Sequence, residues 1–369
     1  MGSGCSHEHA DNPSTLSLKH YEMHRVIGQG GFGKVNAVIR KKTKPPQWFA
    51  IKTLAKGTVV KKDCVKMVWN ERNLLASLRA SPYVVRMHHA FQDQENCYVV
   101  MDLLLGGDLK FHLRNTFKTG LKSESDVRFY VAGVLLALRD LHNSHILHRD
   151  VKMDNILLDN KGYPRLTDLG VSVYTENLRY RGNSGTPSHM APELWSRNYD
   201  HGVASDLFSL GVVAFELAFA KRPWPNSVRP IIEANPDFLV SLPPEQFSNY
   251  FPNEILETAT CPLSLPCRSF LRGLLHPVES CRLGFNGGVD EARAHEWFRD
   301  FDWASYEQQK LPAPIQPIID ENKGNFDSAA HDFDDVLASG KKSQAGLLSS
   351  DEQKLFEGFD YNVEIGSGS

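Results

Sequence analysis

The sequence lacks a long hydrophobic run, clustered cysteines and a strong excess of either charge. No stretch of about 18 consecutive apolar residues occurs, so we expect no transmembrane helix, and the polar first residues contain no secretory signal core. The six cysteines form neither a CxxC pair nor the Cys/His spacing of a zinc site, which indicates free thiols in a reducing compartment. A net charge of -3 lacks the basic surplus of a nucleic-acid-binding domain, so we expect no nucleic-acid partner.

The chain does contain an ordinary globular composition, arranged in two parts. From residue 21 to about residue 50, β-branched and aromatic residues alternate around glycines, which predicts strand, turn and strand. The segment 97–105 is a compact apolar run that predicts a buried strand, whereas 125–143 and 206–220 have apolar residues at helical spacing. Strands followed by helices predict an α+β protein of two lobes with a cleft between them.

A glycine-rich loop, GQGGFGKV, occupies residues 28–35 and has the pattern G-x-G-x-x-G-x-V. Glycines let backbone N–H groups approach phosphates where a Cβ would clash. Alone the pattern is weak, because a Rossmann dinucleotide loop shares it and an ordinary glycine hairpin can imitate it. No helical pattern follows at once, which counts against the Rossmann loop. The hairpin alternative stays open on this motif alone.

Lys52 ends a strand-like segment, and Glu71 lies in the segment 65–78, where apolar residues at helical spacing predict a helix. A lysine that holds phosphates must itself be positioned, and a carboxylate on a neighbouring helix can do that. Most lysines that follow a strand are simply solvated, so Lys52 indicates function only in combination with Glu71.

The segment HRDVKMDN at residues 148–155 is the most specific motif in the chain. Asp150 can accept a hydrogen bond from an incoming hydroxyl, and Lys152 can stabilise charge on a phosphoryl group. Asn155 can bind Mg²⁺ through its carbonyl oxygen, and Asp168 of the TDLG sequence supplies a second hard oxygen ligand. Phosphoryl transfer depends on positioning and charge neutralisation, so these residues predict that reaction, with a hydroxyl as acceptor.

Together these motifs resemble the signature of the eukaryotic protein kinases over residues 21–298. The resemblance implies a bilobal protein-kinase fold, with a β-rich N-lobe at about 21–103 that contains one key helix and a helical C-lobe at about 104–298. It implies ATP as cofactor with Mg²⁺, or Mn²⁺ in its place, and proteins as substrates. The catalytic residues that it implies are Asp150, Lys152, Lys52, Glu71 and Thr186, and the metal ligands are Asn155 and Asp168.

The resemblance also implies an ATP-binding set, in which apolar residues sandwich adenine, Met101 is the gatekeeper and Asp108 reaches the ribose. For each apolar residue, a plain core position is the alternative. The full set is Ile27, Gly28, Gly30, Gly31, Phe32, Gly33, Val35, Ala50, Lys52, Val85, Met101, Asp102, Leu104, Asp108, Leu157, Thr167 and Phe326. In addition, Arg282 looks like the arginine that pairs with Glu193 of the Ala-Pro-Glu motif.

The region after the domain resembles the C-terminal tail of the AGC group of serine/threonine kinases. The likeness of the tail rests on NFD at 325–327 and FEGFDY at 356–361, and GTP at 185–187 within the domain also resembles the AGC group. It implies that 299–369 form this tail, and that Phe356 and Phe359 dock on the N-lobe. A disordered tail with chance aromatics is the alternative. Leu169 in place of the usual Phe resembles G-protein-coupled-receptor kinases, and the start resembles YANK-type kinases, so the subfamily stays open.

The activation loop departs from the AGC pattern. Gly182 stands where the phospho-threonine is usual, so we expect Arg149 to lack its phosphate partner. Asp360 stands at the phospho-acceptor position of the tail motif, where a carboxylate needs no upstream kinase. We therefore hypothesise that activity depends little on phosphorylation at these two sites. Ser184, Thr175 and Tyr180 remain candidate phosphorylation sites.

Residues 1–20 are interpreted as a flexible arm that begins with MGSGCS. This start fits N-myristoylation at Gly2, with Cys5 placed for palmitoylation, although a cloning remnant would look similar. Two acyl chains anchor a protein stably. We therefore expect the protein at the cytoplasmic face of a membrane, with a cytoplasmic pool. We also expect it to be a monomer.

Asp154 lies where AGC kinases read basic side chains before the acceptor, and Glu233 could contribute or be a solvated surface acid. We therefore expect a preference for basic substrates. A pseudokinase scaffold should lack Lys52, Asp150 or Asp168, and all three are present. A small-molecule kinase should lack the AGC tail and the Ala-Pro-Glu motif, and both are present.

Overall fold

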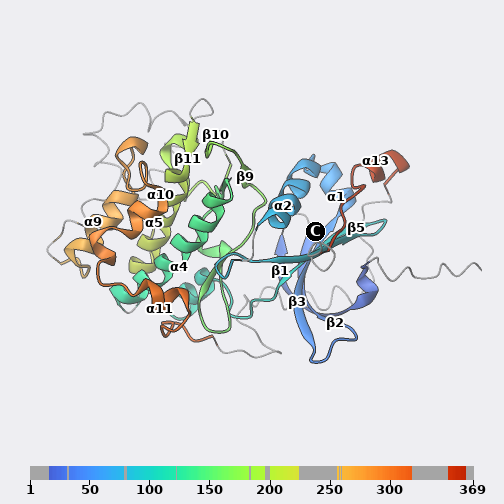
Figure 1. The fold of residues 1–369 in the computed structure, drawn as a ribbon, viewed down its shortest axis with the longest axis horizontal. Coiled ribbons are helices and arrows are strands. Elements are labelled where there is room, and N and C mark those ends of the chain that lie inside the picture. The colour runs from blue at the N-terminus through green and yellow to red at the C-terminus, as the bar shows by residue number, and fades with distance from the viewer. Residues whose placement is uncertain are drawn as a thin grey trace, which may run out of the picture. The chain divides into compact units, whose positions relative to one another are not determined.

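The computed structural model describes residues 16–30, 33–78, 81–121, 123–182, 184–195, 200–223, 256, 258, 260–317 and 348–362. These residues form two compact units. The first unit holds the described residues up to 65, then 87–103 and 348–362. The second unit holds those of 66–86 and 104–317. A β-rich unit and a helical unit together give the α+β bilobal architecture that the sequence predicts (Figure 1).

The first unit is built on a six-stranded antiparallel sheet in the order β1-β2-β3-β5-β4-β12. Its strands are β1 (Tyr21–Gly30), β2 (Gly33–Arg40), β3 (Gln47–Ala55), β4 (Met87–Gln92), β5 (Asn96–Asp102) and β12 (Tyr361–Asn362). Alternate side chains of these strands point to one face, where Val38, Ile51 and Val100 are fully buried in an aromatic-rich core. The strand predicted at 97–105 is β5, which ends earlier than expected.

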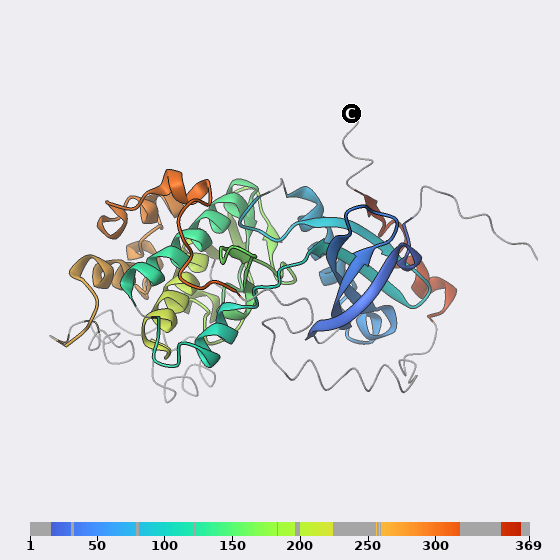
Figure 2. The ribbon, with the colours of Figure 1, turned by 90° about the horizontal axis from the view of Figure 1, so that it is seen from below.

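Short elements border this sheet. A 3₁₀ turn η1 (Leu18–His20) precedes β1, α1 (Lys56–Lys61) follows β3, and α13 (Ser350–Lys354) precedes β12. The C-terminal segment with α13 and β12, drawn in red, lies against the strands of its own unit in both views (Figure 2). The edge of the sheet is therefore completed by residues from the other end of the chain.

The second unit is centred on two long helices, α4 (Glu124–Asn143) and α5 (Val203–Phe219). Ser123 and Asp126 form a capping box at the start of α4. The residues of α5 are mostly apolar and are buried on all sides from Ala204 to Leu217, which is typical of a helix in a core. A Cβ on Gly211 would lie 2.9 Å from the Leu274 side chain, so glycine allows α5 to pack closely there.

The second unit contains further helices and 3₁₀ turns. They are α2 (Val65–Ser77), α3 (Leu109–Asn115), α9 (Leu265–Leu274), α10 (Gly288–Arg293), α11 (Trp303–Glu307), η2 (Met153–Asn155), η3 (Pro192–Trp195), η5 (Glu279–Cys281) and η6 (Glu296–Phe298). The helix predicted at 65–78 is α2. Among the described residues, none of the helices has the length and apolar character that crossing a membrane requires. The described cysteines are free thiols, as their spacing indicates.

Three small two-stranded sheets position the loops of the second unit. They are β6 (Ile146–Leu147) with β9 (Val173–Tyr174), β7 (Ile156–Leu158) with β8 (Pro164–Leu166), and β10 (Arg179–Arg181) with β11 (Asp200–Gly202). The HRDVKMDN segment lies between β6 and β7, and TDLG lies between β8 and β9. Both loops are therefore held at each end by strand pairing.

Candidate functional site

The backbone of the HRDVKMDN loop is fixed by a buried carboxylate, Asp206 of α5. Asp206 accepts hydrogen bonds from the backbone N–H groups of His148 (2.9 Å) and Arg149 (2.7 Å), and its Oδ2 lies 2.9 Å from Nε2 of His142. Burial by itself raises the pKa of Asp206. The hydrogen bonds from His142 and from the loop N–H groups outweigh this effect and keep the pKa below its ordinary value. Asp206 is therefore an ionised anchor for the loop.

Asp150 lies at the centre of a network of donors. Its Oδ1 accepts from the backbone N–H of Thr186 (2.8 Å), and its Oδ2 accepts from Nζ of Lys152 (2.6 Å) and Nδ2 of Asn155 (3.2 Å). Nζ of Lys152 also donates to Oγ1 of Thr186 (2.8 Å). Burial raises the pKa of Asp150, but the hydrogen bonds from Lys152 and Thr186 lower it by more than burial raises it. The pKa of Asp150 therefore lies below the ordinary value. The structure thus brings three predicted residues around the ionised carboxylate of a fourth, Asp150.

Asn155 and Asp168 offer oxygen atoms that suit a hard divalent cation. Nδ2 of Asn155 donates to Asp150, so Oδ1 is the atom of this amide that could hold a metal. The backbone N–H of Thr167 donates to the backbone oxygen of Asn155 (3.0 Å), which ties the two loops together. Asp168 is exposed and has a positive φ of 65°. Mg²⁺ is commonly held by one or two carboxylates together with substrate phosphates, so this donor set fits it.

Glu71 is buried on α2, beside the TDLG loop. Asn70 of α2 donates a hydrogen bond of 2.7 Å to the backbone oxygen of Ser172, which attaches the helix to the segment after Asp168. A Cβ on Gly170 would lie 3.2 Å from Oδ1 of Asp168 and 4.0 Å from Oε2 of Glu71. The two carboxylates therefore both border Gly170. Lys52 belongs to the first unit, and its pairing with Glu71 stays a prediction.

The glycine-rich loop is a β-hairpin between β1 and β2, in which Gly30 pairs with Gly33. Because a strand follows the loop, the Rossmann interpretation is excluded. A Cβ on Gly33 would lie 1.7 Å from the backbone oxygen of Thr53, so only glycine fits there. At Gly28 a Cβ would make only ordinary contact with Val35, so packing does not demand that glycine, whereas close approach of a phosphate would. Gly31 and Phe32 lie outside the described residues.

The residues predicted to contact adenine and ribose are divided between the two units. In the first unit, Ala50 pairs with Met101 across β3 and β5, and the Asp102 carboxylate lies 2.7 Å from Nε2 of His88. In the second unit, Asp108 bridges to Leu157, and its Oδ1 caps α3 by accepting from Phe111 N–H. Ile27, Val35, Val85, Leu104 and Thr167 occupy described positions, and Phe326 lies outside them. Adenine contact by these residues stays a prediction.

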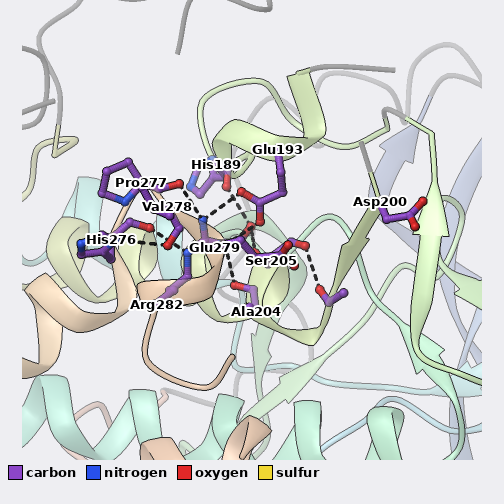
Figure 3. Close-up of polar contacts among 12 residues, drawn as sticks. His189, Glu193, Asp200, Ala204, Ser205, His276, Pro277, Val278, Glu279 and Arg282 are labelled. Atoms are coloured by element: carbon purple, nitrogen blue, oxygen red, sulfur yellow. Dashed lines mark hydrogen bonds and ion pairs between the residues drawn. The ribbon is translucent and has the colours of Figure 1, made fainter. Parts of the chain in front are cut away.

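Arg282 and Glu193 form the buried pair that the sequence predicts (Figure 3). Nη1 of Arg282 donates to Oε1 of Glu193 (2.6 Å), and Nη2 donates to Oε2 (2.9 Å). The guanidinium also donates to the backbone oxygens of His276, Pro277 and Ala204. This fork-to-fork geometry fixes the Ala-Pro-Glu segment against α5 and the turn that contains Arg282.

Sequence reasoning missed the partners of Arg149. Its guanidinium donates to the backbone oxygens of Val171 (3.0 Å) and Gly182 (3.2 Å) and lies 4.6 Å from the ring centre of Tyr180. The expectation that Arg149 lacks a phosphate partner named no replacement, and the structure supplies one. The pairing of β10 with β11 brings Tyr180 next to Arg149, and no local sequence pattern predicts that pairing.

The segment with Phe356 and Phe359 is packed into the first unit. Both side chains are fully buried, and Gln92 donates a hydrogen bond of 2.7 Å to the backbone oxygen of Phe356. The ammonium of Lys56 lies 5.2 Å from the Phe356 ring centre and donates to the Gln353 side chain (2.8 Å). Residues 348–362 therefore make apolar and polar contacts within the first unit.

Comparison with known proteins identifies similar chains. Residues 21–298 match the family model described as protein kinase domain. A probable serine/threonine-protein kinase of Dictyostelium discoideum is 32% identical over 358 residues, which are 94% of this chain and 71% of that protein. The serine/threonine-protein kinase SCH9 of Saccharomyces cerevisiae is 34% identical over 83% of this chain and 35% of its own length. Mouse beta-adrenergic receptor kinase 1 is 32% identical over 94% of this chain and 48% of its own length.

Proposed function

The chain belongs to the protein kinase family, with AGC-like serine/threonine kinases among its relatives, and we propose that it transfers the γ-phosphoryl group of ATP to serine or threonine hydroxyls of proteins. The observation that carries the proposal is the network around Asp150, where Lys152, Thr186 and Asn155 converge on one ionised carboxylate. A pseudokinase that only serves as a scaffold has no need to keep this arrangement.

The network suggests how the chain's own residues act. Asp150 accepts the hydrogen bond of the substrate hydroxyl and takes its proton as the oxygen attacks. Lys152 bridges Asp150 and Thr186, so its ammonium is placed to stabilise charge that develops beside the attacking oxygen. Asn155 and Asp168 would hold Mg²⁺ or Mn²⁺, which neutralises phosphate charge when bound with ATP. The glycine hairpin and Lys52 would hold the phosphates.

A direct assay tests this function. Purified protein is incubated with γ-labelled ATP, Mg²⁺ and a serine peptide, and label on the peptide is measured. We expect Asp150→Asn to lower kcat on the order of 10²–10⁴-fold, because the general base is lost. Asp290→Asn, on the exposed face of α10, is the matched control and should leave transfer unchanged. Wild-type protein that transfers no label would overturn the proposal.

Substrate preference rests on Asp154. Its carboxylate is exposed beside the catalytic loop and lies 2.5 Å from Nζ of Lys110 on α3. A basic side chain of the substrate would exchange with Lys110, so we propose a preference for basic residues before the acceptor that Lys110 moderates. In a peptide-library screen, Lys110→Met should strengthen selection of arginine and Asp154→Asn should abolish it. Equal selection in both variants would contradict this. Glu233 lies outside the described residues.

The C-terminal aromatic residues support a role within the molecule. We propose that docking of Phe356 and Phe359 on the first unit stabilises the active kinase, which we expect to be a monomer. The support is their complete burial and the pairing of β12 with β4. Truncating either buried phenylalanine to alanine should lower the free energy of unfolding by about 3–5 kcal/mol. An unchanged unfolding midpoint in denaturant would contradict the docking.

Membrane attachment rests on the sequence MGSGCS alone, since Gly2 and Cys5 lie outside the described residues. We propose myristoylation at Gly2 and palmitoylation at Cys5, which would place the kinase at the cytoplasmic face of a membrane with a cytoplasmic pool. In cells fed a labelled myristate analogue, Gly2→Ala should lose the label. Cys5→Ser should keep the label but move to the soluble fraction. Label retained by Gly2→Ala would contradict the assignment.

A further inference from the structure

Arg149 is a buried cation whose guanidinium donates hydrogen bonds only to groups without formal charge, although the charge of Asp206 also acts on it. It lies immediately before Asp150, and its backbone has a positive φ of 68°. Two backbone oxygens accept its hydrogen bonds, and the ring of Tyr180 covers it at 4.6 Å. Burial lowers the pKa of Arg149, yet a guanidinium stays protonated in proteins. A desolvated cation of this kind needs compensation, and the ring face supplies part of it.

The Tyr180 ring occupies the space in which a side chain at position 182 would begin. A Cβ on Gly182 would lie 2.9 Å from Cε1 of Tyr180 and 3.7 Å from Nη2 of Arg149. Gly182 also has a φ of 145°, a conformation that residues with a Cβ rarely adopt. A side chain at 182 and the ring at its observed place are therefore incompatible. By the resemblance, position 182 is where the phospho-threonine is usual, so ring and phosphate are alternatives.

The ring is held in place by the β10–β11 pair. Tyr180 lies opposite His201 in the register, and their rings meet edge to face with centroids 5.9 Å apart. Arg179, the neighbour of Tyr180, forms two hydrogen bonds with the Glu279 carboxylate, at 2.7 and 3.2 Å. His201 is fully buried, and within the described part of the chain neither of its ring nitrogens has a hydrogen-bond partner. Burial, then the charge of Arg149, lower the pKa of His201 to about 4, so a neutral imidazole supports the ring.

We propose that Tyr180 is a positioning residue, which holds Arg149 and thereby the backbone of Asp150 without a phosphate on the activation loop. The inference rests on the proposed kinase function, because it concerns how that site is kept in order. Asp206 holds the N–H of Arg149, and the ring holds its guanidinium, so the residue before Asp150 is fixed at both ends. The Tyr180 hydroxyl has no part in this, and phenylalanine should serve equally well.

Activity of phosphatase-treated protein tests the role of the ring. Tyr180→Leu should lower kcat roughly tenfold, the size of effect expected of a desolvated cation–π contact, with KM for ATP unchanged. Tyr180→Phe should stay within about twofold of wild type. Tyr174→Leu on β9, where Tyr174 is 57% exposed, is the matched control and should have no effect. Wild-type rates in Tyr180→Leu, or an equal fall in Tyr180→Phe, would overturn the inference.

Position 182 gives a second and independent test. Gly182→Glu should lower kcat at least as much as Tyr180→Leu, because its side chain collides with the ring. In the double variant Tyr180→Leu/Gly182→Glu the carboxylate can replace the ring beside Arg149, so kcat should exceed that of either single variant. A double variant no better than the single variants would show that the ring and an anion are not interchangeable, and would count against the proposal.

The rate of tryptic cleavage after Arg179 and Arg181 reports how well the contact between the Tyr180 ring and Arg149 orders the loop, and it does not depend on catalysis. Tyr180→Leu should be cut several-fold faster than wild type at these sites, whereas Tyr180→Phe should be cut at the wild-type rate. An inactive wild-type protein that still shows this pattern would defeat the proposed function and leave the positioning role standing. Equal cleavage of all three proteins would defeat the positioning role alone.

Discussion

Arg149 and Arg282 are both buried arginines of the second unit, yet their surroundings differ. Arg282 is bound by both oxygens of Glu193, and its donors all find acceptors. Arg149 has two backbone oxygens and an aromatic face, and its Nε has no partner within the described residues. A charge neutralised by a buried carboxylate is a permanent anchor. A charge held by neutral groups leaves no buried carboxylate without a partner when it is removed, so its removal should cost less stability.

The largest expected effect is on the anchored arginine. Arg282→Met leaves the Glu193 carboxylate buried without its partner, so the free energy of unfolding should fall by about 3–5 kcal/mol. Chemical denaturation followed by circular dichroism measures this. The double variant Arg282→Met/Glu193→Gln removes both charges and should recover part of the loss. A loss of only about 1–2 kcal/mol in the single variant, the size expected at Arg149, would show that the two arginines are anchored alike.

The same substitution at Arg149 should affect catalysis more than stability. Arg149→Met leaves no carboxylate without a partner, so the free energy of unfolding should fall by only about 1–2 kcal/mol. Because Asp150 follows directly, kcat should fall by at least tenfold while KM for ATP changes little. Denaturation and steady-state kinetics on the same preparation measure both. A stability loss as large as that of Arg282→Met would remove the distinction between the sites.

The Arg149 region should also weaken the protein in acid through His201. The charged groups that act on this ring are Arg149 and Arg179, which lower its pKa, and Asp206 and Glu193, which raise it. Its pKa is lowered to about 4 in the folded protein, against about 6.5 in an unfolded chain. Between pH ~6.5 and 4, the unfolded state therefore binds a proton at His201 that the folded state does not bind. The free energy of unfolding is unaffected by His201 above pH ~6.5 and falls as the pH drops towards 4. His201→Phe should flatten that part of the stability–pH curve, and an unchanged slope would contradict the assignment.

The smallest effect should come from an exposed ion pair next to Tyr180 on the β10–β11 pair. Arg181 and Asp200 lie opposite each other on β10 and β11, with 71% and 44% of their side chains exposed. Exposed pairs contribute little, so Asp200→Asn should change the free energy of unfolding by less than about 1 kcal/mol and leave kcat unchanged. A tenfold fall in kcat would mean that charge on β11, and not the ring of Tyr180, orders the loop.

The sequence predicted those parts of the molecule whose signals are local. The periodicity of α2, α4 and α5 and the motif around Asp150 are all visible over short stretches of chain. The resemblance to the protein kinases implied the pairing of Arg282 with Glu193, which lie far apart in the sequence.

The position of Tyr180 could not be predicted in the same way. It depends on the register between β10 and β11, whose residues are separated by a long connection, and a cation–π contact has no spacing rule. The sequence showed only that Gly182 leaves the phosphate position empty. Which group would replace the phosphate is decided by tertiary packing, because the ring and a side chain at 182 compete for the same volume.

Transfer by protein that has no phosphate on its activation loop tests the central claim most directly. Wild type and Asp150→Asn are treated with phosphatase, checked by mass spectrometry and mixed with γ-labelled ATP and a basic serine peptide in a rapid-quench instrument. The account predicts prompt labelling of the peptide by wild type and loss of labelling in Asp150→Asn. No labelling by dephosphorylated wild type, with activity restored by phosphorylating the loop, would contradict it.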